Sequence, residues 1–154
     1  MFERYTESAR RVLVLSLAEA RERGSGSIRP EHVLLGVIRV ADNITSGILR
    51  DAGVSIEVLS SVVPEPALPI PLSVEIPFHV ATKRVLQYAA GESERLQGAL
   101  LADYILADDH IGPEHLLLGI LREEDATGAA MLAQRGATLD VVRRECAQRL
   151  RGRS

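Results

Sequence analysis

The decapeptide PEHVLLGVIR, residues 30–39, occurs a second time as PEHLLLGILR, residues 113–122. The two copies are identical except where one aliphatic residue replaces another. Each copy begins with proline, which suits the first position of a helix because the N–H that it lacks would have no helical partner there. The apolar residues that follow recur at helical spacing. The sequence therefore predicts two equivalent amphipathic helices.

The match extends on both sides of the decapeptides. Residues 48–59 align with residues 131–142 at the same offset, whereas residues 5–13 align with residues 78–86 at an offset ten residues shorter. The second copy therefore holds an insertion between its first and second helices, which we place within residues 96–109.

Each copy contains apolar stripes and caps for four helices. The predicted N-caps include Thr6, Ser55 and Thr138, and Gly53 and Gly136 are predicted to end helices. Gly36 is expected to let a neighbouring helix approach closely.

The segment between the copies, residues 64–77, contains five prolines and cannot be helical. We predict an all-α fold in which this proline-rich linker joins two pseudo-twofold-related four-helix repeats. Repeat one covers residues 2–63 and repeat two covers residues 78–151. Units this small are hardly stable alone, so we expect one domain over residues 1–154.

The composition excludes several classes of protein. Hydrophobic residues make up 46% of the 154 residues and aromatic residues only 3%, which favours aliphatic helix-on-helix packing. The net charge of −3 argues against a nucleic-acid-binding protein. No apolar run approaches the roughly 20 residues that span a bilayer, and the N-terminus shows no export signal. With Cys146 as the only cysteine, we expect a cytoplasmic protein.

Catalysis is the weaker of two interpretations of the repeated Glu-His pair, Glu31-His32 and Glu114-His115. A metallopeptidase helix needs a second histidine one turn on, and neither copy supplies it. No nucleophile motif or phosphate-binding loop is recognisable. We therefore predict no enzymatic activity, no metal and no cofactor. We interpret both histidines as half-buried residues that pair with the backbone near a helix start.

Binding is the stronger interpretation. A glutamate in the first turn of a helix can be merely stabilising, because it interacts favourably with the helix dipole. A carboxylate beside free backbone N–H groups is also a two-part receptor, in which the carboxylate takes a guanidinium and the helix start takes an anion. Both readings apply to Glu31 and Glu114.

The opening MFERYTESARRVLVLSLAEA, the paired PEH-x-LLG-x-x-R blocks and the endings of the form L-x-x-x-G resemble the Clp N-terminal repeat domain, or Clp R domain, over about residues 2–151. This is the substrate- and adaptor-binding domain of ClpA/ClpC-type unfoldases. The resemblance implies a compact, non-catalytic, all-α module that binds Clp adaptor or substrate proteins. In some members it binds phosphoarginine-marked substrates, and in actinobacterial members cyclic peptide antibiotics.

The resemblance also implies site residues. The glutamates that hold the phosphoarginine guanidinium in the family correspond to Glu31 and Glu114, and Thr6 matches a further site position. We hypothesise that Thr6 lies near Glu31 and faces the anionic part of the ligand. The family usually reads G-T-E-H where this chain has a proline in place of the threonine, and His79 replaces the threonine equivalent to Thr6. We expect the insertion to lie close to the second site.

The antibiotic-docking surface of actinobacterial members corresponds to Phe2, Arg10 and Lys83. The resemblance predicts a non-catalytic binding protein of the Clp protease system. The alternative is a self-protection protein that sequesters a cyclic peptide antibiotic. The altered motif and the insertion favour a standalone actinobacterial ClpC N-domain-like protein over an excised domain of an unfoldase.

Overall fold

The computed structural model describes residues 2–40, 44–63, 67–102, 110–124 and 126–152. Within these ranges the chain forms eight α-helices, and its only β pairings are two isolated bridges. The helices are α1 (Glu7–Glu22), α2 (Pro30–Arg39), α3 (Thr45–Asp51), α4 (Ile56–Ser60), α5 (Val80–Ala102), α6 (Pro113–Arg122), α7 (Thr127–Gln134) and α8 (Leu139–Arg151). The all-α prediction is therefore confirmed.

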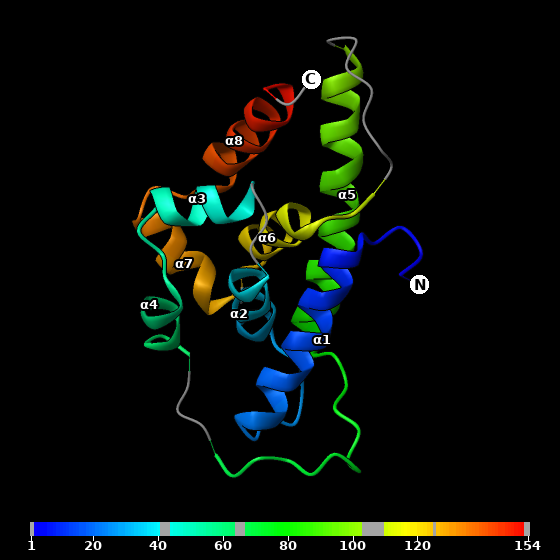
Figure 1. Ribbon diagram of the computed structural model, residues 1–154, viewed down its shortest axis with the longest axis vertical. Helices are drawn as coiled ribbons and strands as arrows, with labels where there is room; N and C mark the ends of the chain where they lie inside the picture. Colours follow the sequence, from blue (N-terminus) through cyan, green and yellow to red (C-terminus); the bar gives the residue numbers. More distant parts are fainter. Residues whose placement is uncertain (1, 41–43, 64–66, 103–109, 125, 153–154) are drawn as a thin grey trace.

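The two decapeptide helices, α2 and α6, lie at the centre of the molecule and contact each other (Figure 1). Helix α1 packs on α2, and α5 packs on α6 in the equivalent way. The shorter helices α3, α4 and α7 lie on the opposite side of α2 and α6 (Figure 1), and α8 packs against both α6 and α5. The apolar faces of the repeats thus meet in one core.

The helix ends follow the predicted signals. Thr6, Ser55 and Thr138 each accept a hydrogen bond from a backbone N–H in the first turn of the helix that follows. Gly53 and Gly136, which come just after α3 and α7, have φ values of 69° and 86°. A left-handed glycine is the commonest way to end a helix, because it has no Cβ to clash.

The repeated glycine of the decapeptides sets the packing distance between paired helices. A Cβ on Gly36 would lie 2.6 Å from the carbonyl oxygen of Val12 in α1. A Cβ on Gly119 would lie 2.5 Å from the carbonyl oxygen of Val85 in α5. Both contacts are with backbone atoms that cannot rotate away, so only glycine allows these close helix crossings.

Two short backbone pairings interleave the repeats. Thr6, just before α1, donates its N–H to the carbonyl of Ile111, just before α6, over 3.0 Å. His79, just before α5, donates to Ile28, just before α2, again over 3.0 Å. Each pairing joins the start of the first helix of one repeat to the start of the second helix of the other.

The described part of the linker, residues 67–77, is non-helical and runs along the C-terminal half of α1. The Arg21 guanidinium donates hydrogen bonds to the carbonyl oxygens of Pro71 and Val74, and the N–H of Ile70 donates to the Arg21 carbonyl. The first part of the predicted insertion forms the end of α5, whereas residues 103–109 lie outside the described ranges.

Candidate functional site

The two repeated histidines form the N-terminal caps of α2 and α6. The Arg29 N–H donates to His32 Nδ1 over 2.9 Å, and the Arg29 carbonyl accepts from the His32 N–H over 3.0 Å. His115 makes the same reciprocal pair with Gly112. Both histidines are buried. The interpretation that they pair with the backbone near a helix start is confirmed, but the expectation that they are only half-buried is wrong, because they are 3% and 6% exposed.

Burial also determines the charge of these histidines. Desolvation, followed by the nearby Arg23 cation, lowers the pKa of His32 to about 4. Desolvation likewise lowers the pKa of His115 to about 4. Both rings are therefore neutral at pH 7. His115 Nδ1 lies 3.6 Å from a Glu114 oxygen, but a neutral ring whose Nδ1 already accepts a hydrogen bond does not form an ion pair.

The start of α2 offers few free donors to a ligand. Pro30 has no N–H, and the N–H groups of His32 and Val33 both donate to the Arg29 carbonyl. Among the described residues, the Glu31 N–H is the one amide of this turn for which no backbone acceptor is found. The Glu31 side chain is itself buried. An anion at this helix start would therefore meet one amide rather than several.

The start of α6 differs in detail. The carboxylate of Glu114 folds back over Gly112, where an added Cβ would lie 2.6 Å from Oε1. The glycine at this position thus leaves room for the carboxylate. The equivalent position in repeat one is Arg29, so the two helix starts present different surroundings to a ligand.

The hypothesis placed Thr6 beside Glu31, at the start of α2, but the backbone hydrogen bond of Thr6 lies at the start of α6. Thr6 pairs with Ile111 and so lies at the start of α6, on the side of Glu114. The residue that pairs with the segment before α2 is His79, through Ile28. The Thr6 hydroxyl is used as the cap of α1.

A second candidate surface is a groove of about 610 Å³ between α1 and the linker, which we call the linker groove. Three exposed apolar side chains lie on it: Val14 is 66% exposed, Leu72 88% and Val74 47%. The complete lining is Phe2, Arg10, Leu13, Val14, Leu17, Arg21, Ile28, Leu72, Ser73, Val74, Glu75, Ile76 and Phe78. Exposed apolar groups gathered in one hollow are typical of a binding surface.

Two of the three residues predicted for a peptide surface line this groove. The Phe2 ring is half-buried and packs edge-on against Tyr5 and Phe78, with ring centroids 5.0 Å and 6.3 Å away. The Arg10 guanidinium donates to the Phe2 carbonyl over 3.1 Å. Lys83 is exposed on α5 and is not among the lining residues.

Sequence reasoning missed the linker wall of the groove. Leu72 and Val74 are apolar residues in a segment that cannot be helical. A segment of this kind has no regular apolar face to bury, and this was the available signal that its side chains remain exposed.

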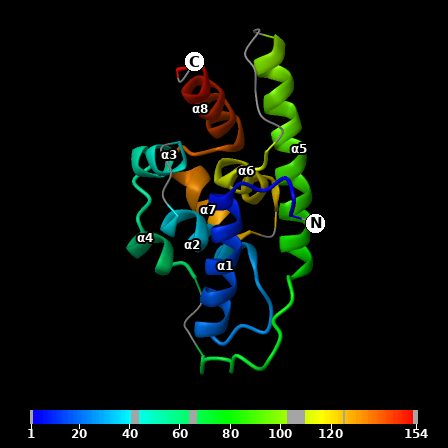
Figure 2. The ribbon, with the colours of Figure 1, turned by 45° about the vertical axis from the view of Figure 1, so that its right-hand side comes forward.

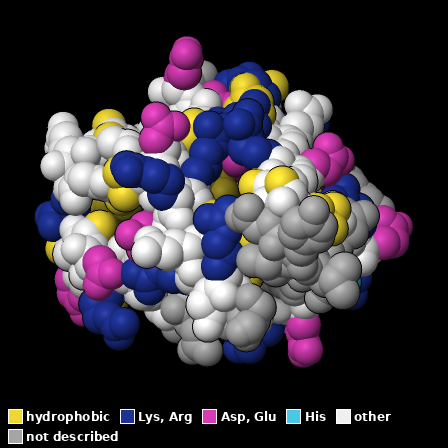
Figure 3. All heavy atoms as spheres, turned by 90° about the horizontal axis from the view of Figure 1, so that it is seen from above, with side chains coloured by type: hydrophobic (Ala, Val, Ile, Leu, Met, Phe, Trp, Pro, Cys, Tyr) yellow, Lys and Arg dark blue, Asp and Glu magenta, His cyan; other side chains and the backbone are white. Residues whose placement is uncertain are grey.

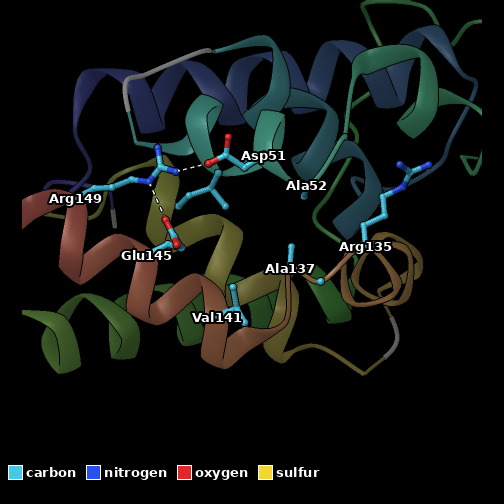
Figure 4. Close-up of a pocket in the computed structure, with 9 residues that line it drawn as sticks. Asp51, Ala52, Arg135, Ala137, Val141, Glu145 and Arg149 are labelled. Atoms are coloured by element: carbon cyan, nitrogen blue, oxygen red, sulfur yellow. Dashed lines mark hydrogen bonds and ion pairs between the residues drawn. The ribbon is translucent and has the colours of Figure 1, made fainter.

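A third hollow, of about 120 Å³, lies between α3 and α8 (Figure 4). Arg149 bridges Asp51 and Glu145 across it, at 2.7 Å and 3.1 Å, and Arg135 donates to the carbonyl of Gly53 over 3.1 Å. Its charged groups therefore pair with one another or with the backbone, and they tie α8 to α3. We interpret this hollow as part of the contact between the repeats.

Within the described ranges, no three His, Cys, Asp or Glu side chains are placed to hold a metal ion together. No helix in the same ranges has both the length and the apolar character to cross a bilayer.

Comparison with known proteins places these features in a family. The family model of the Clp repeat (R) N-terminal domain matches residues 4–103. The chloroplastic chaperone protein ClpC2 of Arabidopsis thaliana is 36% identical over 146 residues, and the chloroplastic ClpA homolog of Brassica napus is 34% identical over 148 residues. Each alignment covers 93% of this chain but only 14–15% of the relative, so the chain spans about a seventh of their length.

Solved structures agree. The N-terminal domain of ClpD from Arabidopsis thaliana matches with a TM-score of 0.66 and 26% identity, over 98% of this chain and 97% of that one. The N-terminal domain of Hsp104 from Candida albicans has a TM-score of 0.71 and covers 99% of this chain and 94% of that one, but at 16% identity it shows the fold alone. The chain therefore belongs to the Clp N-terminal repeat domain family, whose domains are non-catalytic and bind substrates and adaptors in Clp systems.

Proposed function

We propose that this chain binds adaptor or substrate proteins of a Clp protease system through the linker groove and catalyses no reaction itself. The observation that carries the proposal is the group of exposed apolar side chains, Val14, Leu72 and Val74, around one hollow. Leaving them in water costs free energy that a bound segment would recover. The single cysteine, buried Cys146, is compatible with action in the reducing cytoplasm.

The polar groups of the groove indicate how a bound segment would be oriented. Arg21 already donates to two linker carbonyls and so holds the wall in place. The Arg10 guanidinium is exposed, and only part of its donor set is used on the carbonyls of Phe2 and Glu3. A segment with apolar side chains can therefore pack on α1 while its carbonyl groups accept hydrogen bonds from Arg10.

Changing Val14 to aspartate should weaken the binding of an unfolded polypeptide at least tenfold, because a carboxylate would then have to be desolvated in the groove. Fluorescence anisotropy with labelled carboxymethylated α-lactalbumin, a permanently unfolded chain, measures the effect. Leu101→Asp is the matched control, because Leu101 is an exposed apolar residue on α5 outside the groove. Equal binding by Val14→Asp and the wild type would rule out the groove as the site.

The alternative function, sequestration of a cyclic peptide antibiotic, would use the same groove. The observation in its favour is that Phe2 and Arg10 both line the groove. The Phe2→Ala variant should bind an aromatic-rich cyclic peptide at least tenfold more weakly in calorimetry, while its melting temperature changes by only a few degrees. Arg144→Ala, which removes an exposed basic side chain outside the groove, should bind normally. Parallel losses of binding and stability in Phe2→Ala would show that Phe2 is only a core residue.

Phosphoarginine binding by Glu31 and Glu114 is a separate proposal, supported by carboxylates at two helix starts. Pro30 has no N–H, and the N–H groups of His32 and Val33 already donate to the Arg29 carbonyl. Few N–H donors remain for the phosphate at the start of α2, so we expect weak binding. In a titration of free phosphoarginine followed by NMR, Glu31→Gln should remove the amide shifts at the start of α2, and Glu114→Gln those at the start of α6. If the wild type shows no saturable shifts, the glutamates serve only as helix-start charges.

A further inference from the structure

Three arginines converge on one buried carboxylate in repeat two. Glu92 of α5 is 1% exposed. Arg143 of α8 donates from Nε to both Glu92 oxygens over 3.1 Å, and Arg122 Nη1 lies 3.5 Å from Oε1. Arg95 Nε lies 4.0 Å from Oε2, beyond hydrogen-bond distance. The carboxylate is thus satisfied by Arg143, and Arg95 is held only loosely.

The equivalent glutamate of repeat one pairs with two arginines rather than three. Glu19 pairs with Arg23 and Arg39, at 3.2 Å and 2.7 Å. In repeat two, exposed Asp140 approaches Arg143 to 3.8 Å, so two carboxylates face three guanidinium groups and the cluster stays positive. Arg95 is 62% exposed and is the cation best placed to meet a ligand.

A small groove opens beside this cluster, between α5 and α8. We call it the α5–α8 groove, and its lining is Glu92, Arg95, Leu96, Ala99, Leu118, Arg143, Cys146 and Ala147. Leu118 and Cys146 are fully buried, so the interior is apolar, while Arg95 provides a charge at the edge. Its volume is about 100 Å³. An apolar cavity of about 150 Å³ holds benzene, so this groove has room for one aliphatic side chain.

Helices α5 and α8 both terminate at the same end of the molecule (Figure 2), and the groove lies between them. Viewed from that end, basic side chains gather near the middle of the surface, with apolar atoms visible between them (Figure 3). The linker groove is built by α1 and the linker, so the two grooves share no lining residue.

We propose that the α5–α8 groove binds a peptide segment in which an aliphatic side chain is flanked by acidic residues. The aliphatic group would enter the apolar interior and be removed from water. A flanking carboxylate would accept a bidentate hydrogen-bond pair from Arg95, the planar geometry that guanidinium groups favour. A basic segment would be repelled by the same cluster. This inference does not depend on the function proposed for the linker groove.

The probe is the capped tripeptide acetyl-Asp-Leu-Glu-amide, titrated into the full chain at pH 7 and followed by amide shifts in NMR. We expect saturable shifts at Ala99, Cys146 and Ala147. Arg95→Glu should weaken binding at least tenfold by reversing the rim charge. Ala147→Leu should do so by filling the groove without changing any charge. Arg135→Glu, which makes the same charge change on an exposed arginine outside the groove, should bind normally.

Three results would overturn the proposal. If acetyl-Lys-Leu-Lys-amide binds as tightly as the acidic peptide, the charge of Arg95 does not select the ligand. Inorganic phosphate that produces the same shifts would indicate a simple anion site. Shifts that follow protein concentration instead of peptide concentration would indicate contact with a second copy of the chain. The Val14→Asp variant should bind the acidic peptide normally, so a failure of the linker groove would not be mistaken for a failure here.

Discussion

Replacement of Glu92 by glutamine should lower the free energy of unfolding by about 3 kcal/mol, because removal of one member of a buried ion pair leaves its partners uncompensated. Glutamine keeps the shape of the side chain but removes the charge that Arg143 and Arg122 share. Both arginines are partly exposed and can turn toward water, which places the cost at the lower end of the range for buried pairs. Urea unfolding at pH 7, followed by circular dichroism, measures the loss.

Glu19→Gln is the matched control, since Glu19 is the equivalent residue of repeat one but its side chain is 13% exposed. We expect it to cost at most about 1 kcal/mol. The double replacement Glu92→Met with Arg143→Met should recover most of the stability lost in Glu92→Gln, because an apolar pair needs no charge compensation. Equal losses for Glu92→Gln and Glu19→Gln would contradict the argument.

Features that depend on a few neighbouring residues were predictable from the sequence. The prolines at 30 and 113 begin helices, and the caps at Thr6 and Thr138 form as expected. Gly36 lets α1 approach closely, as its place on an apolar helix face suggests. Each of these outcomes is decided by backbone chemistry within one or two turns, and duplication repeats it in the second copy.

Features that depend on contacts between the repeats were not predictable in the same way. Thr6 pairs with Ile111 and so lies at the start of α6 in repeat two, because the segment before each of these helices pairs with the other repeat. Internal alignment relates residues but does not say which copy they contact. The Glu92 cluster brings together residues from α5, α6 and α8. One signal was present: Glu19 and Glu92 align between the copies, as do the arginines that end α2 and α6.

Acidification should destabilise the fold through the two buried histidines. The pKa values of His32 and His115 are about 4 in the folded chain, against about 6.5 in an unfolded one. Between these two pH values the unfolded chain binds more protons than the folded one. The contribution of the neutral histidines to the free energy of unfolding is therefore fully present above pH 6.5 and is lost as the pH falls toward 4. Each histidine should contribute a loss of about 3 kcal/mol over this window. Urea unfolding at half-unit pH steps measures the slope.

The two histidines can be separated, because each caps its own helix. His32→Gln should lower by about one the number of protons that the chain takes up on unfolding between pH 4 and 6.5. The proton taken up by His115 should remain. It should also cost about 1 kcal/mol at pH 7, since glutamine is a poorer match for the Arg29 N–H. NMR titration of the ring protons should give pKa values well below 6.5 for both histidines in the folded protein. A histidine that titrates near 6.5 would be open to water, and its helix start would then be free to meet a ligand instead of being capped from within.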